Sequence, residues 1–175
     1  MESKMKLDVP YYSQFLDVSD PYWMPRACGM ACLKMVLDFF GEKTPPLLEM
    51  CRTGEKEGGY SKHGWFHDYL LKVARGYGLE AERGEKIGEI MGLQKIHDEL
   101  KDGRPVIVSV SKHSLGQNKF HMVLLTGYEE NENGTVFGFY YNDPESLYVE
   151  EGKGLFADIK DFKRDWRRMA IFIRR

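Results

Sequence analysis

The sequence contains candidates for each part of a thiol-based attack on a carbonyl. Such an attack needs a nucleophilic thiol, a base, a group that orients the base, and donors for the developing oxyanion. Cys28 is the candidate thiol, because it precedes an apolar run, 29–40, in which only Lys34 and Asp38 are polar. If this run is a helix, its unpaired amides and positive dipole end stabilise a thiolate at its start. The sequence therefore predicts a reactive cysteine at the mouth of a buried helix.

Histidine is the natural base, and the chain has five histidines. His121 opens an otherwise apolar segment, on the same face as Val123 and Leu125 if that segment is a strand. A histidine at the mouth of a buried strand is held more rigidly than one in a loop. The other four lie in polar or glycine-rich surroundings: His63, His67, His97 and His113. We interpret the first three of these as surface histidines and the fourth as a loop residue. His121 itself can also be read as a satisfied core or edge histidine.

An orienting group for His121 is available at the end of the following strand. Asn142 and Asp143 are adjacent there, and the segment 131–134 (NENG) is a hairpin signal. Antiparallel pairing across this turn brings the end of the second strand beside the start of the first. Adjacent strand residues face opposite ways, so only one of the two can meet His121. The residues NDP are also a common turn sequence, and that reading stays open.

The oxyanion requires hydrogen-bond donors, and Gln14 is the candidate. Its side-chain amide would act together with the backbone N–H of Cys28. Gln14 follows a short extended segment, 7–12, that contains Pro10.

The remaining cysteines favour structural roles. Cys32 is one helical turn after Cys28 and reads as a small buried side chain, and Cys51 reads as structural. A zinc site that includes Cys28 and Cys32 is poorly supported, because no CxxC or HxxH pair is present. A redox pair of the same two cysteines is a weaker alternative function.

The apolar spacing predicts helices in the first half of the chain and strands in the second, an α+β class. Thr44 is the expected N-cap of the second helix, with Pro45 at its first position. The segments 15–26 and 54–64 are expected to be loops that shape specificity pockets. The predicted helices are 29–40, 44–51, 65–77, 93–100 and 162–167. The predicted strands are 105–111, 121–128, 135–143, 147–149 and 169–175, with 7–12 as an edge strand.

Length and composition set further bounds. The 175 residues, 42% of them hydrophobic, predict a single domain, 1–175. A formal charge of −2 gives no reason to expect a nucleic-acid or membrane partner. Three cysteines argue against a disulfide framework, and the first residues hold no apolar signal-peptide core, so we expect a cytoplasmic protein. An extracellular protein whose signal was trimmed stays an alternative.

Five sequence blocks in this order resemble a known family. They are DVPYYSQ, CGMACLKMVLDFFG, LKDGRPVIVSV, FHMVLLTGYEE and YYNDP. The blocks are similar to those of papain-like cysteine peptidases of the bacteriocin-leader-processing (double-glycine) type and their stand-alone relatives. The resemblance runs from residue 7 to about residue 144, and it implies a papain-like α+β fold.

The resemblance also implies roles for individual residues. Cys28 would be the nucleophile, His121 the general acid/base, Asp143 rather than Asn142 the orienting carboxylate, and Gln14 the oxyanion donor. Thirteen residues separate Gln14 from Cys28, more than in papain, which implies an insertion that loops out. The chain has no transporter segments, so the sequence does not support a role coupled to peptide export.

We therefore predict a cysteine peptidase or related thiol hydrolase that cleaves peptide or isopeptide bonds through an acyl-enzyme. It requires no metal or organic cofactor, and its partner is a peptide or protein substrate. The alternative is a catalytically silent peptide-binding domain of the same fold. The oligomeric state is not indicated by the sequence.

Overall fold

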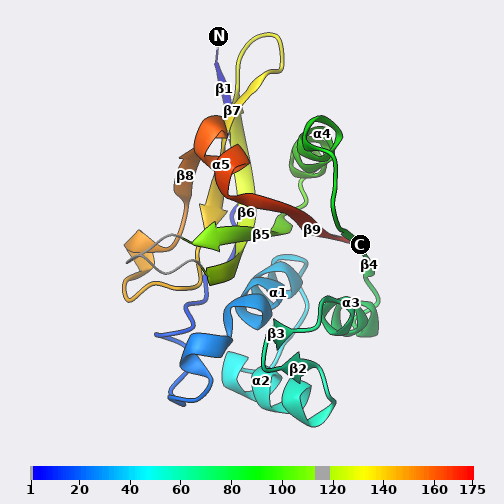
Figure 1. The fold of residues 1–175 in the computed structure, drawn as a ribbon, viewed down its shortest axis with the longest axis vertical. Coiled ribbons are helices and arrows are strands. Elements are labelled where there is room, and N and C mark those ends of the chain that lie inside the picture. Colours follow the sequence, from blue (N-terminus) through cyan, green and yellow to red (C-terminus); the bar gives the residue numbers. More distant parts are fainter. Residues whose placement is uncertain (1, 113–118) are drawn as a thin grey trace.

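The computed structural model describes residues 2–112 and 119–175. A group of helices packs below a large sheet (Figure 1), which confirms the predicted α+β class. None of the described helices is long and apolar enough to cross a membrane. The α-helices are α1 (Cys28–Phe39), α2 (Leu47–Lys56), α3 (His67–Gly76), α4 (Glu89–Lys101) and α5 (Ile159–Asp165).

The main sheet has the strand order β4-β9-β5-β6-β7-β8, and β1 pairs with β6. All pairings between the described strands are antiparallel. The strands of the main sheet are β1 (Ser3–Lys6), β4 (Glu80–Gly84), β5 (Val106–Lys112), β6 (Lys119–Glu130), β7 (Val136–Asn142), β8 (Leu155–Asp158) and β9 (Trp166–Arg174). A separate short hairpin is formed by β2 (Tyr60–Ser61) and β3 (Gly64–Trp65).

Helix α1 is the centre of the larger hydrophobic core. Its residues 29–37 are all buried, and the helix contacts β6 on one side and α2 and α3 on the other. The chain turns directly after it at Gly41, where φ is +85°, a conformation that glycine adopts without strain. Because the helix is apolar on nearly every side, burial on all sides holds it in place and fixes the position of its first residue.

The one buried cation of α1 is fully engaged. The Lys34 ammonium donates to Thr44 Oγ1 at 2.6 Å and to the Pro45 carbonyl at 2.9 Å, and it lies 3.4 Å from Asp38. Thr44 in turn donates to Asp38. The prediction that Thr44 caps the second helix was therefore wrong. Thr44 is a hydrogen-bond partner of α1, and α2 begins only at Leu47.

The two faces of the sheet carry different cores. Ile107, Met122 and Leu124 belong to the core that contains α1, α2 and α3. Val108, Val123 and Leu125, which alternate with them, belong to the core that contains residues of α4 and α5. This alternation confirms the predicted register of β6, with His121 in phase with Val123 and Leu125.

Two strand predictions were wrong, and two strands of the main sheet at its edges were not predicted. The segment 7–12 is not an edge strand, because the β1 ladder occupies Ser3–Lys6 and Pro10 lacks an N–H for further pairing. The segment 147–149 is not a strand either, and a 3₁₀ turn follows at Val149–Glu151. The strand that pairs with β7 at this edge is β8, which was not predicted. Strand β4, which lies in a stretch without clear periodicity, was not predicted either.

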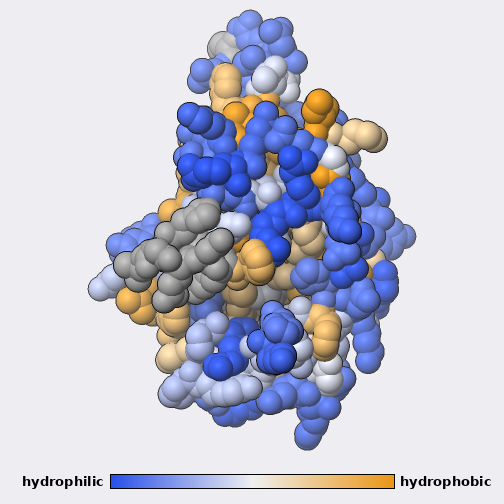
Figure 2. All heavy atoms as spheres, viewed as in Figure 1, coloured by the Kyte–Doolittle hydropathy of each residue, from blue (hydrophilic) through white to orange (hydrophobic). Residues whose placement is uncertain are grey.

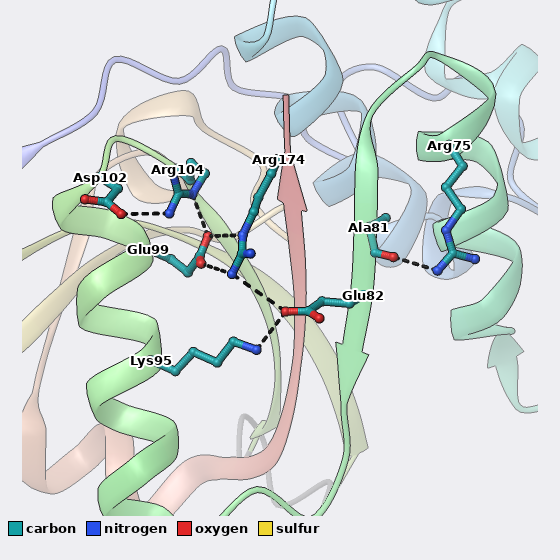
Figure 3. Close-up of polar contacts among 8 residues, drawn as sticks. All are labelled: Arg75, Ala81, Glu82, Lys95, Glu99, Asp102, Arg104 and Arg174. Carbon is teal, nitrogen blue, oxygen red and sulfur yellow. Dashed lines mark hydrogen bonds and ion pairs between the residues drawn. The ribbon is translucent and has the colours of Figure 1, made fainter.

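A buried carboxylate of α4 is bonded to the edge of the sheet formed by β4 and β9 (Figure 3). Glu99, whose side chain is 4% exposed, accepts hydrogen bonds from Arg104 Nε at 2.7 Å and from Arg174 on β9. Arg174 also lies 3.7 Å from Glu82 on β4, which pairs with Lys95 of α4 at 2.7 Å. This network joins α4 to β9 and β4, the two strands at one edge of the main sheet.

Candidate active site

Three elements of the fold bring Cys28, His121 and Asp143 together. Cys28 is the first residue of α1, His121 lies near the start of β6, and Asp143 directly follows β7. Strands β6 and β7 pair so that Leu124 lies opposite Asn142, which sets the end of β7 beside the start of β6. The hairpin predicted from the sequence thus accounts for the proximity of His121 and Asp143.

The imidazole of His121 is held by the carboxylate of Asp143. Nε2 of His121 lies 2.6 Å from Oδ1 of Asp143, and the two side chains are 2% and 16% exposed. Oδ1 of Asp143 also accepts the backbone N–H of Glu145 at 2.8 Å. A carboxylate that receives a second donor in this way is fixed in orientation, and it fixes the ring in turn.

The ring of His121 also contacts the thiol of Cys28, and both pKa values respond. Burial raises the pKa of Cys28, but the hydrogen bond and charge of His121, together with backbone amides of Met122 and Gly29, lower it below the ordinary value. Burial lowers the pKa of His121, but its hydrogen bonds to Asp143 and Cys28 and their charges raise it to about 9. Both directions favour a thiolate beside an imidazolium.

The other two thiols are in a different environment. Cys32 and Cys51 are both buried, and burial raises the pKa of each, to about 12 for Cys51. They are therefore protonated at neutral pH and unreactive, in agreement with their predicted structural roles. Among the described residues, no group of three or more histidine, cysteine or acidic side chains is arranged to hold a metal ion.

Asn142, the alternative orienting residue, faces away from His121. Its side chain is buried, with Nδ2 donating to Met35 Sδ at 3.7 Å and Oδ1 accepting the N–H of Gly154 at 2.9 Å. Asn142 therefore ties the end of β7 to α1, while the next residue, Asp143, meets the histidine. The alternation along the strand separates the two roles.

Gln14 is buried beside the segment that leads into α1. Its Nε2 donates to the Met24 carbonyl at 2.8 Å, and its side chain is almost completely buried. One of the two Nε2 hydrogens is used in this bond, so the second is left for another acceptor. The role of Gln14 as an oxyanion donor stays a prediction.

The segment around Gln14 is also joined to the loop that carries Asp143. The backbone N–H of Gln14 donates to the Pro144 carbonyl at 2.8 Å, and the Tyr11 hydroxyl donates to the Asp143 carbonyl at 2.6 Å. The hydroxyl of Ser13 donates to the Ser146 carbonyl. Three consecutive contacts thus hold residues 11–14 against residues 143–146.

Sequence reasoning missed one charged neighbour of the histidine, Glu145. Its Oε2 lies 3.7 Å from Nδ1 of His121, and its side chain is 18% exposed. The Asp143-Pro144 turn brings it there, because Asp143 accepts the N–H of the residue two positions later. An Asx turn at NDPE was therefore the signal in the sequence.

The remaining histidines differ from expectation in one case. His97 is not a surface residue: Nε2 lies 2.9 Å from Glu130, and the ring packs edge-on against Tyr128. The reason is that α4 turns this side toward β6. His63 is exposed and His67 is half-buried, and both line the cleft described next, whereas His113 lies outside the described residues.

A cleft of about 500 Å³ opens beside Cys28 and His121. Figure 2 shows hydrophilic side chains around a hollow between the sheet half and the helical half, with apolar atoms inside it. Arg26, from the end of the predicted loop 15–26, and Lys62, from the predicted loop 54–64, both line the cleft. The second of these segments is not a simple loop, because α2 extends to Lys56 and the β2–β3 hairpin follows.

Comparisons with solved structures show the same fold at low sequence identity. A double-glycine motif protease from an AMS/PCAT transporter, solved with its leader peptide, has a TM-score of 0.62 and 23% identity, covering 97% of this chain and 93% of that one. A protein from Bacillus anthracis described as a C39-like peptidase has a TM-score of 0.69 and 17% identity over 99% and 98% of the two chains. The peptidase domain of Streptococcus ComA, a bi-functional ABC transporter involved in quorum sensing, has a TM-score of 0.60 and 21% identity over 86% and 92%.

The structural neighbours confirm the papain-like α+β fold that the sequence predicted. No curated protein matches the sequence. The model of the Peptidase_C39 like family, however, matches residues 6–171, nearly the whole chain. The chain therefore belongs to the Peptidase_C39 like family.

Proposed function

We propose that this protein is an active thiol hydrolase that cleaves amide bonds of a peptide or protein substrate, with Cys28 as nucleophile. The observation that carries the proposal is the line of contacts Cys28–His121–Asp143, with the pKa of the thiol lowered and that of the imidazole raised to about 9. The family supports the same class of chemistry.

The first half of the reaction forms an acyl-enzyme. The thiolate of Cys28 attacks the carbonyl carbon of the scissile amide, and the C=O π electrons move to the oxygen. The Cys28 N–H, at the start of α1, and the Gln14 amide would stabilise that oxyanion. As the tetrahedral intermediate collapses, the C–N bond breaks, and protonated His121 gives its proton to the leaving amine.

The second half restores the enzyme. His121, now neutral, takes a proton from water, and the hydroxide attacks the thioester carbonyl. The C–S bond breaks, the acid product leaves, and the thiolate returns beside the imidazolium. Asp143 keeps its negative charge throughout, so it stabilises each imidazolium stage without accepting a proton itself.

The peptide nature of the substrate is part of the proposal. One structural neighbour was solved in complex with a leader peptide, and here a cleft of about 500 Å³ runs past the candidate nucleophile. Mass spectrometry of a peptide library incubated with wild type and with Cys28→Ala tests turnover. Cleavage by wild type alone supports the proposal, and no cleavage by either protein favours a peptide-binding domain without activity.

Alkylation tests the ion pair independently of any substrate. At about pH 6, where ordinary thiols are protonated, iodoacetamide should modify Cys28 and spare Cys32 and Cys51. The selectivity should disappear in His121→Ala, because the partner that lowers the thiol pKa is gone. Equal slow modification of all three cysteines in wild type would contradict the proposed nucleophile.

A further inference from the structure

We propose that the cleft beside Cys28 selects peptide segments that carry acidic side chains close to the scissile bond. The inference rests on the proposed function only in that Cys28 cuts the selected segment. Selection itself is a property of the cleft and can be measured without turnover.

Positively charged side chains enter the cleft from both halves of the molecule. They come from the segment before α1, the β2–β3 turn, the β4–α4 connection and the start of β9. These residues are Arg26, Lys62, Lys86 and Arg167, joined by His63 and His67. Of the described residues that line the cleft, one, Glu85, is a carboxylate, and it pairs with Arg83 at 3.3 Å.

This concentration of positive charge is opposite to the charge of the whole chain. The formal net charge is −2, yet the described residues that line the cleft include four permanent cations and one carboxylate. One of the four, Arg26, donates to the Tyr22 carbonyl at 2.6 Å and lies over the Tyr22 ring. The cations available to a bound segment are therefore Lys62, Lys86 and Arg167. A concave, partly apolar wall focuses the field of such charges on whatever enters it. A segment with Asp or Glu side chains is therefore attracted, and a segment with Lys or Arg side chains is repelled.

A second cavity, lined by three aspartates, also borders His121. This cavity, of about 200 Å³, is lined by Asp143, Asp161 and Asp165, and no Lys or Arg is among its described lining residues. His121 lines both cavities. Asp161 and Asp165 pair with Arg164, at 3.1 Å and 3.0 Å, and Asp143 pairs with His121 at 2.6 Å. The second cavity is therefore largely neutralised, and the attraction for an acidic segment comes from the cleft.

Two of the cations are held at the rim of the cleft by specific local structure. The Arg167 guanidinium lies over the ring of Phe120, 3.1 Å from its centroid, although that ring is 65% exposed. Lys86 has φ of +51°, a backbone conformation in which glycine or asparagine is less strained. The stacking fixes the Arg167 charge at the rim of the cleft, and Lys86 adds a second charge there despite its strained backbone.

The effect expected for each acidic side chain follows from the strength of exposed ion pairs. One such pair changes kcat/KM by about twofold to fivefold, and several pairs give a larger total. The preference should weaken as the ionic strength rises, because salt screens exposed charges. A preference based on shape alone would not depend on salt.

Matched peptides test the proposal. Starting from a cleaved library member, peptides are made with Glu, Gln or Lys at each position on either side of the scissile bond. Wild type should cleave the Glu peptides fastest and the Lys peptides slowest at one or more positions. Equal rates for the three peptides at every position would overturn the proposal.

Variants identify the responsible residues. Lys62→Gln, Lys86→Gln and Arg167→Gln should each reduce the Glu-over-Gln ratio by about twofold to fivefold, and Lys86→Glu should shift the preference toward Lys peptides. Lys43→Gln and Lys160→Gln, exposed lysines that do not line the cleft, are the matched controls and should leave the ratio unchanged. Equal effects in cleft and control variants would contradict the assignment to the cleft.

Binding separates this inference from the proposed function. Fluorescence anisotropy of the labelled Glu, Gln and Lys peptides with Cys28→Ala measures selection in the absence of turnover. If wild type cleaves no library member, the same binding measurement is made with library peptides that differ only in Glu, Gln or Lys at one position; tighter binding of the Glu members by Cys28→Ala then means that the proposed activity fails and the selectivity stands. If wild type cleaves peptides without regard to charge and binding is equally indifferent, the selectivity fails and the activity stands.

Discussion

Nε2 of His121 lies 2.6 Å from Oδ1 of Asp143, and this single contact determines which ring nitrogen meets the thiol. Because Nε2 is engaged by the carboxylate, we infer that the hydrogen bond with Cys28 uses Nδ1. One ring nitrogen therefore contacts the carboxylate, and the other is left for the thiol. This division of roles leads to predictions that depend on charge as well as shape.

Replacing Asp143 by asparagine should keep a hydrogen-bonding side chain but remove the charge. The pKa of His121 should then fall from about 9, because the neighbouring negative charge that raises it is lost. We expect kcat/KM to drop by on the order of 10² or more, since general acid–base catalysis is typically worth that much. Peptide cleavage and iodoacetamide rates measured across pH check this. Asn142→Asp in the same background is the control, because Asn142 faces Met35 and should not restore activity.

The pH profile of wild type should show a plateau bounded by the two shifted groups. The thiolate–imidazolium pair exists above the lowered pKa of Cys28 and below the raised pKa of His121, about 9. Activity should fall on the alkaline side near pH 9, where His121 loses its proton, and on the acid side below the ordinary range of thiols. Measurement of kcat/KM from acid to alkaline pH tests both limbs. An alkaline limb near the ordinary histidine pKa of about 6.5 would contradict the ion pair.

Gln14→Ala should reduce kcat with little change in KM. The loss of one oxyanion donor typically costs about 10² to 10³ in kcat, because the donor acts on the transition state rather than on the substrate. The variant also loses the bond to the Met24 carbonyl, so thermal unfolding must be measured beside activity. A large fall in Tm with unchanged kcat would assign Gln14 a structural role only.

Glu99→Gln should lower the free energy of unfolding and leave the rate of peptide cleavage unchanged. Burial raises the pKa of Glu99, but the hydrogen bonds and charges of Arg104 and Arg174 lower it below the ordinary value. A carboxyl whose pKa is depressed by folding stabilises the protein above the unfolded pKa of about 4.3, and this contribution disappears as pH falls through the folded value.

Urea unfolding tests this role of Glu99 at neutral and at acid pH. At neutral pH the variant removes charged hydrogen bonds to two arginines, which keep Asp102 and Glu82 as their other partners, and we expect a loss of about 2 kcal/mol. Near pH 3 the difference from wild type should shrink, as wild-type Glu99 becomes protonated too. Lys95→Gln removes an exposed partner of the same network and should cost under about 1 kcal/mol. A difference between Glu99→Gln and wild type that does not depend on pH would exclude the charge as its cause.

The sequence predicted the parts of the fold where local pattern and tertiary burial agree. Helix α1 is apolar on nearly all sides, and it is buried on nearly all sides. The β6–β7 hairpin has alternating residues and a strong turn signal, so its register followed from period two. The proximity of His121 and Asp143 is a consequence of that register.

Elements held by long-range partners were predicted less well. Strand β4 (EAERG) has one buried side chain, Ala81, and owes its conformation to β9, about ninety residues later in the chain. His97 lies in a polar stretch but is buried, because α4 packs against β6. In both cases the deciding contact is distant in sequence, and local composition contains no signal for it.

The same reason explains what the site revealed only in three dimensions. Glu145 approaches His121 through a turn geometry, and the cations of the cleft come from four separate segments. No window of the sequence contains them together. The choice of Asp143 over Asn142 was implied by family resemblance and agrees with the contacts, whereas strand alternation alone left it open.

Residues 11–14 and 143–146 are joined by three hydrogen bonds. The segment 11–14 therefore supports the position of Asp143, which holds the imidazole of His121. A ligand or a proteolytic cut that separates residues 11–14 from residues 143–146 would displace the Gln14 amide and the Asp143 carboxylate together. The proposed active site would thus lose its oxyanion donor and its orienting carboxylate through a change outside the cleft, while Cys28 stays in place at the start of α1.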